Sequence, residues 1–155
     1  MNPETRYTNR FREFLKRIEP TGLIVKHSDR FNNGIADLTV GWATGHVPVV
    51  FVVEVKYLNC VVKKKRKIPL KASQLEYLLA WDRIGSSPVV LVGTKNGTAF
   101  YTMDTYDGTL YAEDLREDKT AWEILRKTSI AISEERLARK CHTAPSAVTK
   151  PQKDS

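Results

Sequence analysis

The chain has 155 residues, 41% hydrophobic and 28% charged, and a chain of this size and composition usually folds as a single globular domain. Its 25 lysines and arginines against 18 acidic residues give a formal net charge of +7, so nucleic acid is the leading expected partner, ahead of anionic membranes. The two cysteines form no metal-ligand or disulfide pattern and no apolar run approaches the roughly 18 residues that span a bilayer, which indicates a soluble intracellular protein, cytoplasmic or nucleoid-associated, without a zinc site.

The first half of the chain predicts one helix and three strands. Apolar residues recur at helical spacing within residues 8–18, before a proline and a glycine that close the segment. The segment LIVKH (23–27) is a predicted strand, GIADLTVGW (34–42) a second and VPVVFVVEVKYL (47–58) a third. Residues 43–46, ATGH, form a short turn, so the second and third strands should make a hairpin.

The register of this hairpin brings two carboxylates together. If the turn centres near Gly45 and His46, Asp37 lies across from Glu54, because both are equally far from that centre. Strand alternation sends Glu54 and Lys56 to one face and the flanking valines to the other. An ionised carboxylate on a largely apolar strand is costly unless it is paired or bound to a metal, so these charges require a reason.

The second half of the chain predicts a crossover. Ser73 and Glu76 have the spacing of a capping box, so a helix should begin near Ser73 and end at Gly85. Residues 88–93, PVVLVG, form a predicted buried strand, which an Asn-Gly turn connects to a partner over 98–103. A strand–helix–strand connection favours parallel pairing, so we expect an α/β fold with a mixed central sheet flanked by helices.

The C-terminal region predicts short helices and a tail. Residues 118–127 and 133–140 have helical patterns, and the segment 142–155 lacks the large apolar residues that would offset the entropy of ordering. We therefore expect one domain over residues 1–132, followed over 133–155 by a C-terminal helix and a flexible basic tail.

Three short motifs occur in a recognisable order. GIAD, ending at Asp37, is followed by EVK from Glu54 to Lys56 and by SQ, ending at Gln74, at the start of a helix. In this order and strand placement the chain resembles the PD-(D/E)XK nuclease superfamily. It is most similar to the VRR-NUC group and the related Holliday-junction resolvases, whose pattern is G-x-P-D, then E-x-K, then a glutamine that opens the next helix. Ala36 stands where that pattern has a proline.

The resemblance covers residues 11–94 and implies a restriction-endonuclease-like core within a nuclease-like domain. It also implies roles for five residues. Asp37 and Glu54 are hard oxygen donors suited to Mg²⁺, for which Mn²⁺ would substitute, and the carbonyl of Val55 would complete the metal shell. Lys56 would lie beside the attacking water and the scissile phosphate, orienting one and offsetting the charge of the other. Gln74 would contact the phosphate or a water near the helix N-terminus.

Each of these residues also has an ordinary structural interpretation. Glu54 and Lys56 could form a salt bridge on one face of a half-exposed strand. Asp37 alone could be a turn or strand-end residue, and Gln74 could be a solvated residue of the first helical turn.

Glu13 is a further candidate metal ligand, because many members of the superfamily add an acidic residue from an N-terminal helix. Arg10 and Arg17 lie at i−3 and i+4 from Glu13, the spacing at which ordinary ion pairs form. We favour the ion pair as the interpretation of this residue.

A basic run lies between the third strand and the next helix, and its position beside the proposed site favours phosphate contact over a purely solvated loop. Its members are Lys63, Lys64, Lys65, Arg66, Lys67 and Lys71. A group of aromatic residues could stack on unpaired bases, but strand cores use the same residue types, so core packing is the first interpretation for Phe100, Tyr101, Tyr106 and Tyr111.

The sequence thus predicts a divalent-metal-dependent deoxyribonuclease, an endonuclease that cleaves phosphodiester bonds of DNA, with branched or junction DNA as the preferred substrate. The resolvases of the superfamily act as dimers because two symmetrical cuts need two sites, and a homodimer is left open here. The alternative is a non-catalytic nucleic-acid-binding or assembly module that keeps the fold. Metal-dependent cleavage distinguishes the two.

Overall fold

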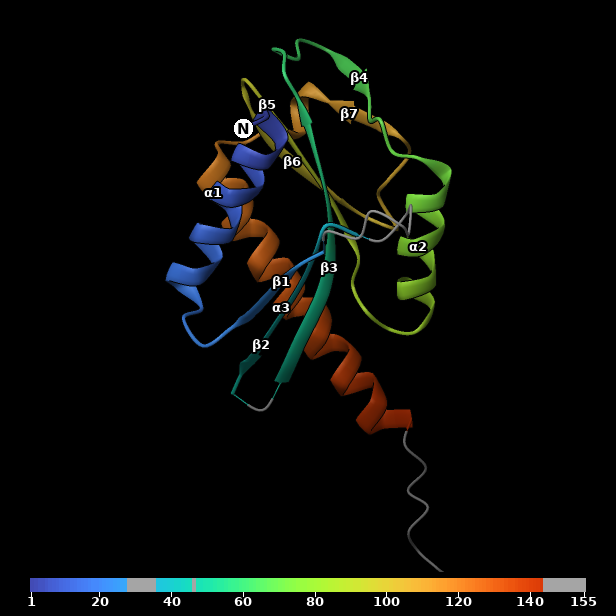
Figure 1. The fold of residues 1–155 in the computed structure, drawn as a ribbon. Coiled ribbons are helices and arrows are strands. Elements are labelled where there is room, and N and C mark those ends of the chain that lie inside the picture. Colours follow the sequence, from blue (N-terminus) through green and yellow to red (C-terminus); the bar gives the residue numbers. More distant parts are fainter. Residues whose placement is uncertain (28–35, 46, 144–155) are drawn as a thin grey trace, which may run out of the picture.

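The computed structural model describes residues 1–27, 36–45 and 47–143, arranged as a sheet with helices on both sides (Figure 1). The elements in chain order are α1 (Pro3–Ile18), β1 (Leu23–Lys26), β2 (Leu38–Thr44), β3 (Val47–Leu58), β4 (Lys65–Lys67), α2 (Ala72–Arg83), β5 (Val89–Thr94), β6 (Gly97–Thr102), β7 (Thr109–Tyr111), the 3₁₀ turn η1 (Ala112–Asp114) and α3 (Asp118–Thr143). None of the helices in this described part of the chain is long and apolar enough to cross a membrane.

The main sheet has five strands in the order β1-β2-β3-β5-β6. The pairs β1–β2, β2–β3 and β5–β6 are antiparallel, whereas β3 and β5 are parallel and are connected through α2. The predicted α/β class, the mixed sheet and the crossover helix are therefore confirmed.

Each face of the sheet carries its own hydrophobic core. Buried side chains of α1 and α3, among them Phe11 and Trp122, pack with Phe51 on one face. On the other face Leu78 of α2 and Leu110 of β7 pack with the sheet. Figure 1 shows α1 (blue) and α2 (green) on opposite sides of β3, with α3 (orange) crossing behind the strand. Because alternate residues of β3 face opposite cores, the face on which a charged residue lies decides which helix it meets.

Two helices begin earlier than the sequence pattern predicts. α1 starts at Pro3, because the Asn2 side chain accepts the Thr5 N–H at 2.7 Å and the proline has no N–H to satisfy. α2 starts at Ala72, and the capping box predicted at residues 73 and 76 is wrong. Gln74 accepts the backbone N–H of Lys71 at 2.9 Å, so the side chain that caps this helix is the glutamine.

The two short C-terminal helices are one continuous helix, α3, which runs through position 132. The intervening residues 128–132 contain neither glycine nor proline, so nothing in the backbone interrupts the helix. Ser129 is buried there, and Ile130 packs against the core of α1. The expected flexible tail lies mostly in residues 144–155, which are outside the described part of the chain.

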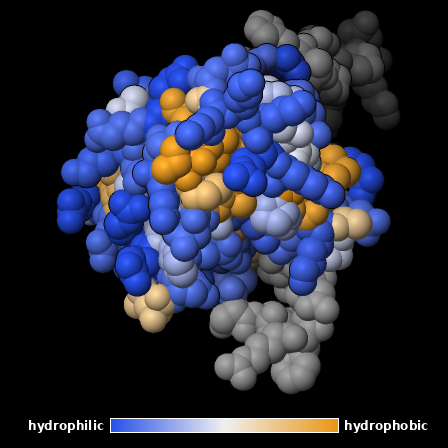
Figure 2. All heavy atoms as spheres, turned by 90° about the horizontal axis from the view of Figure 1, so that it is seen from above, coloured by the Kyte–Doolittle hydropathy of each residue, from blue (hydrophilic) through white to orange (hydrophobic). Residues whose placement is uncertain are grey.

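The basic run between β3 and α2 is only partly a loop. Three of its residues form β4, which pairs antiparallel with β7 in a separate ribbon of two strands. We call this pair the β4–β7 ribbon. It lies at the end of the molecule towards which β3 runs (Figure 1). Figure 2 views the molecule from above and shows hydrophilic side chains over most of that surface, with hydrophobic patches between them.

Candidate active site

β3 extends beyond the end of its partner β2. Along this unpaired part of the edge, carboxylates accept the hydrogen bonds of the backbone N–H groups. The β2–β3 ladder ends at Val53. Two residues further on, the Val55 N–H donates to Asp37 Oδ2 at 2.8 Å, and the next edge amide, that of Tyr57, donates to Glu4 Oε2 at 3.2 Å. Acidic side chains from two different elements therefore converge on the last part of one strand edge.

Glu54 lies on the adjoining face of β3. The hairpin register continues by one residue to place Asp37 opposite Glu54, as the sequence predicts. The side chain of Glu54 is only 1% exposed, and its Oε1 atom lies 3.2 Å from Lys56 Nζ. The predicted salt bridge therefore exists, but on a buried part of the strand rather than a half-exposed one.

Gln74 connects α2 to this carboxylate. Its Oε1 accepts the Lys71 N–H, and its Nε2 donates to Glu54 Oε1 at 2.7 Å. Both ends of the amide are used, so Gln74 is not a solvated first-turn residue. The glutamine holds the Glu54 carboxylate and the N-terminus of α2 together.

The second oxygen of Glu54, Oε2, is buried and has no hydrogen-bond partner among the residues that the structure describes. A buried carboxylate oxygen without a partner is costly, and a cation is one of the groups that can satisfy it. Asp37 supplies a second hard oxygen beside it. Because N–H and C=O of one strand residue point to the same side, the carbonyl of Val55 faces the same edge as Asp37.

These groups fit a magnesium ion better than a zinc ion. Mg²⁺ is commonly held by one or two carboxylates, with water and phosphate oxygens in the remaining positions. Within residues 1–27, 36–45 and 47–143, no group of three or more histidine, cysteine or acidic side chains is arranged to hold a metal ion. The chain itself would therefore supply only part of a coordination shell.

The carboxylates of the site resist ionisation. Burial, together with the nearby charge of Asp37, raises the pKa of Glu54 to about 7 against the opposing charge and hydrogen bond of Lys56. Burial also raises the pKa of Asp37, against the Val55 hydrogen bond and the charge of Lys56, and it raises the pKa of Glu4. Several carboxylates therefore lie close together around Lys56, an arrangement that additional positive charge would stabilise.

The raised pKa values predict how the metal-free protein responds to pH. Glu54 titrates near 4.5 when unfolded and near 7 when folded, so its contribution to stability is present below about pH 4.5 and is lost as the pH rises to about 7. The loss is on the order of 3 kcal/mol. Asp37→Asn removes a charge that raises this pKa, so the variant should gain stability relative to the parent over this pH range. Urea unfolding in EDTA at several pH values measures the difference, and a parallel dependence of both proteins would contradict it.

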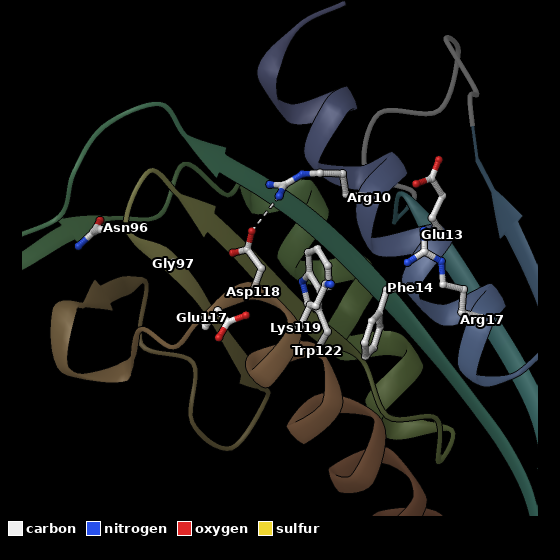
Figure 3. Close-up of a pocket in the computed structure, with 10 residues that line it drawn as sticks. All are labelled: Arg10, Glu13, Phe14, Arg17, Asn96, Gly97, Glu117, Asp118, Lys119 and Trp122. Carbon is white, nitrogen blue, oxygen red and sulfur yellow. Dashed lines mark hydrogen bonds and ion pairs between the residues drawn. The ribbon is translucent and has the colours of Figure 1, made fainter.

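The structure does not bring Glu13 to the other carboxylates. Glu13 follows Glu4 by nine residues, which is about 2.5 helical turns and about 14 Å along the axis, so it lies on the opposite side of α1. It lines a cavity of about 620 Å³ between α1 and α3 (Figure 3). In the described part of the chain it also lacks the expected ion pair with Arg10 or Arg17; Arg10 pairs with Asp118 at 3.0 Å.

The acidic residue that α1 contributes is Glu4, which the sequence pattern did not single out. One signal was available, because Asn2 followed by Pro3 is typical of a helix start and places Glu4 in the first turn. Glu4 also shares a face with Tyr7, at i+3, whose ring centroid lies 5.5 Å from that of Tyr57. The buried face of α1 therefore carries Glu4 to the end of β3.

The mixed five-stranded sheet, in which the parallel strands β3 and β5 are joined through the crossover helix α2, has a restriction-endonuclease-like fold. Among solved structures, the chain is similar to Hjc, a Holliday junction resolvase from Archaeoglobus fulgidus, with a TM-score of 0.52 and 13% identity over 81% of this chain and 98% of that one. A VRR_NUC domain also matches, with 24% identity, a TM-score of 0.38 and coverage of 57% of this chain and 85% of that one. No family model and no curated protein matches the sequence. The fold implied by the motif resemblance is confirmed.

Proposed function

We propose that the protein is a divalent-metal-dependent endonuclease that cleaves DNA phosphodiester bonds, with branched DNA as its preferred substrate. The observation that carries the proposal is the Glu54 carboxylate, which is buried beside Asp37 and Lys56 and has one oxygen without a partner in the described residues. A purely structural salt bridge would not require a second buried acid next to it. The likeness to a resolvase fold and the net charge of +7 favour DNA as the substrate.

The side chains of Asp37 and Glu54 and the carbonyl of Val55 would hold the metal, and Glu4 would add negative charge at the rim. When bound, Mg²⁺, or Mn²⁺ in its place, activates water for attack and stabilises negative charge on the phosphate and the leaving oxygen. Lys56 places its ammonium beside the same carboxylates, where it would offset charge that develops on the phosphate.

Two further features would position the substrate. Gln74 fixes the Glu54 carboxylate through one hydrogen bond and stands in the first turn of α2, whose N-terminus favours an anionic group. Lys71, the residue that precedes α2, would add a positive charge at the same place. The remaining cations of the basic run, Lys63 to Lys67, would bind phosphates further along the DNA. Two symmetrical cuts at a junction need two sites, which a homodimer would supply.

A cleavage assay tests the proposal. Purified protein is incubated with Mg²⁺ or Mn²⁺ on duplex, single-stranded, flap and four-way substrates. We expect cleavage that EDTA abolishes and that is fastest on the branched substrates. DNA binding on all four substrates without cleavage in either metal would instead support the non-catalytic module.

A further inference from the structure

The β4–β7 ribbon has one face in the core and one facing outward. Arg66 pairs with Leu110, which is 0% exposed and packs in the core, so the β-carbons of both lie on the core-facing side. Because side chains alternate along a strand, the neighbouring pair of Lys65 and Tyr111 lies on the outward face. The pair of Lys67 and Thr109 lies there too.

Tyr111 on this face is held in place by its own hydrogen bonds. Its hydroxyl donates to Asp107 Oδ2 at 2.6 Å, and its backbone N–H donates to the Tyr101 hydroxyl at 3.2 Å, which in turn donates to Asp114. Core packing, the first interpretation of the aromatic residues, applies to Tyr101, which is 5% exposed. Tyr111 is only half-buried and presents a fixed aromatic ring beside Lys65.

The ribbon is also attached directly to the candidate active site. Its first strand, β4, is inserted between β3, which carries Lys56, and α2, which carries Gln74, with short connections on both sides. Lys65 and Lys67 put two positive charges on the outward face, and Asp107, which accepts from the Tyr111 hydroxyl, offsets only one of them. The ribbon lies at the end towards which β3 runs (Figure 1), so a polyanion that reaches the site along this end of the strand would lie near it.

We infer that the outward face of the ribbon, formed by Lys65, Lys67, Thr109 and Tyr111, binds a DNA strand beside the active site, with the two lysines on phosphates and Tyr111 stacked on an unpaired base. The inference rests on the proposed function and adds the feature of the substrate that is recognised. Phosphate contacts alone would need only the charges. A half-exposed ring held beside them offers a surface that any base can stack on once it has left the duplex.

Fluorescence anisotropy in EDTA, which prevents cleavage, measures binding to a labelled flap substrate and to the matching blunt duplex over a range of salt concentrations. Tyr111→Ala should weaken flap binding about tenfold and leave duplex binding unchanged, because stacking needs an unpaired base. Tyr111→Phe keeps the ring and loses the bond to Asp107, so it should retain most of the flap preference. An equal loss on both substrates for Tyr111→Ala would overturn the stacking role.

The lysines are tested by the salt dependence of binding to the duplex. Removal of one phosphate-binding lysine should lower the slope of log affinity against log salt by about 0.9, so the Lys65→Ala, Lys67→Ala double variant should lower it by about 2. Arg66→Ala removes the same charge from the core-facing side and should lower the slope less than Lys65→Ala. Lys16→Ala, on α1 away from the ribbon, should leave it unchanged. Equal effects of Arg66→Ala and Lys65→Ala would overturn the assignment of the outward face.

The two proposals fail separately. If the parent binds flap DNA through Tyr111 but no metal restores cleavage, the ribbon surface stands and the nuclease proposal fails. If the parent cleaves branched DNA while Tyr111→Ala and the lysine variants bind like the parent, the nuclease proposal stands and the ribbon surface fails. Thermal melts of each variant exclude loss of folding as the cause.

Discussion

Asp37→Asn and Glu54→Gln should each lower the rate of metal-dependent cleavage by about a thousandfold or more. In either variant, one of the two anionic side chains of the candidate site becomes neutral with almost no change in shape. The amide oxygen of Asp37→Asn can still accept the Val55 N–H, and that of Glu54→Gln can still accept from Gln74. The loss of rate would therefore report the missing charge rather than a rearranged strand edge.

The double variant should lose little beyond either single variant, because two ligands of one ion act as a unit and their losses are not additive. Single-turnover rates at saturating DNA and a fixed Mg²⁺ concentration provide the comparison. Glu13→Gln is the matched control, since it removes one acid from the far side of α1 and should cleave like the parent. Small, independent effects of Asp37→Asn and Glu54→Gln would show that the two acids do not share a metal ion.

The same site can be examined without substrate. A ligand that binds only the folded state stabilises it by mass action, so Mn²⁺ should raise the melting temperature of the parent. Neither Asp37→Asn nor Glu54→Gln should respond to the same extent, because each lacks one of the carboxylates. Glu13→Gln should respond like the parent. This measurement does not depend on the choice of DNA substrate.

The part of the site that the sequence predicts best is the part set by local geometry. A short turn at residues 43–46 fixes a register in which Asp37 and Glu54 are equally distant from the centre, and the structure has that register. Strand alternation then places Glu54 and Lys56 on one face. The hairpin register and the two-residue alternation of a strand depend on the local backbone alone. Neither requires knowledge of a residue far away in the sequence.

The parts that the sequence could not predict depend on tertiary contacts. Glu4 reaches the site because the buried face of α1 packs against β3, which decides the turn of the helix that lies near the strand end. Gln74 caps α2 because Glu54, twenty residues earlier, holds the other end of its amide. β4 exists because β7, more than forty residues later, supplies its only partner strand in the described sheets.

The continuity of α3 is another feature that the sequence pattern did not predict. Its pattern weakens over residues 128–132, where β-branched residues lower helix propensity, so periodicity suggests two helices. In the structure Ser129 is buried and Ile130 packs against the core that α1 and the sheet share, and this burial outweighs the small loss of propensity. The sequence therefore identifies the helical segments but not their union.

Lys56→Ala should bind DNA nearly as well as the parent and cut it at least about a hundredfold more slowly. The Lys56 side chain is 12% exposed and its Nζ lies 3.2 Å from Glu54 Oε1, too far inside the site to contribute much to the attraction of distant phosphates. An ammonium there acts mainly on charge that develops in the transition state, so its loss changes the rate more than ground-state affinity. Lys65→Ala on the ribbon should show the reverse pattern, with weaker binding but an unchanged rate at saturating DNA.

The experiment pairs single-turnover cleavage with anisotropy in EDTA for Lys56→Ala, Lys65→Ala and the parent. Removing one partner of a buried pair leaves Glu54 without its nearest cation, so Lys56→Ala should also be less stable, and the assays belong well below its melting temperature. A lower melting temperature with an unchanged cleavage rate would show that Lys56 only neutralises Glu54 in the fold. A slow variant that still binds places the ammonium at the reacting phosphate, because the salt bridge alone predicts no such separation of rate from affinity.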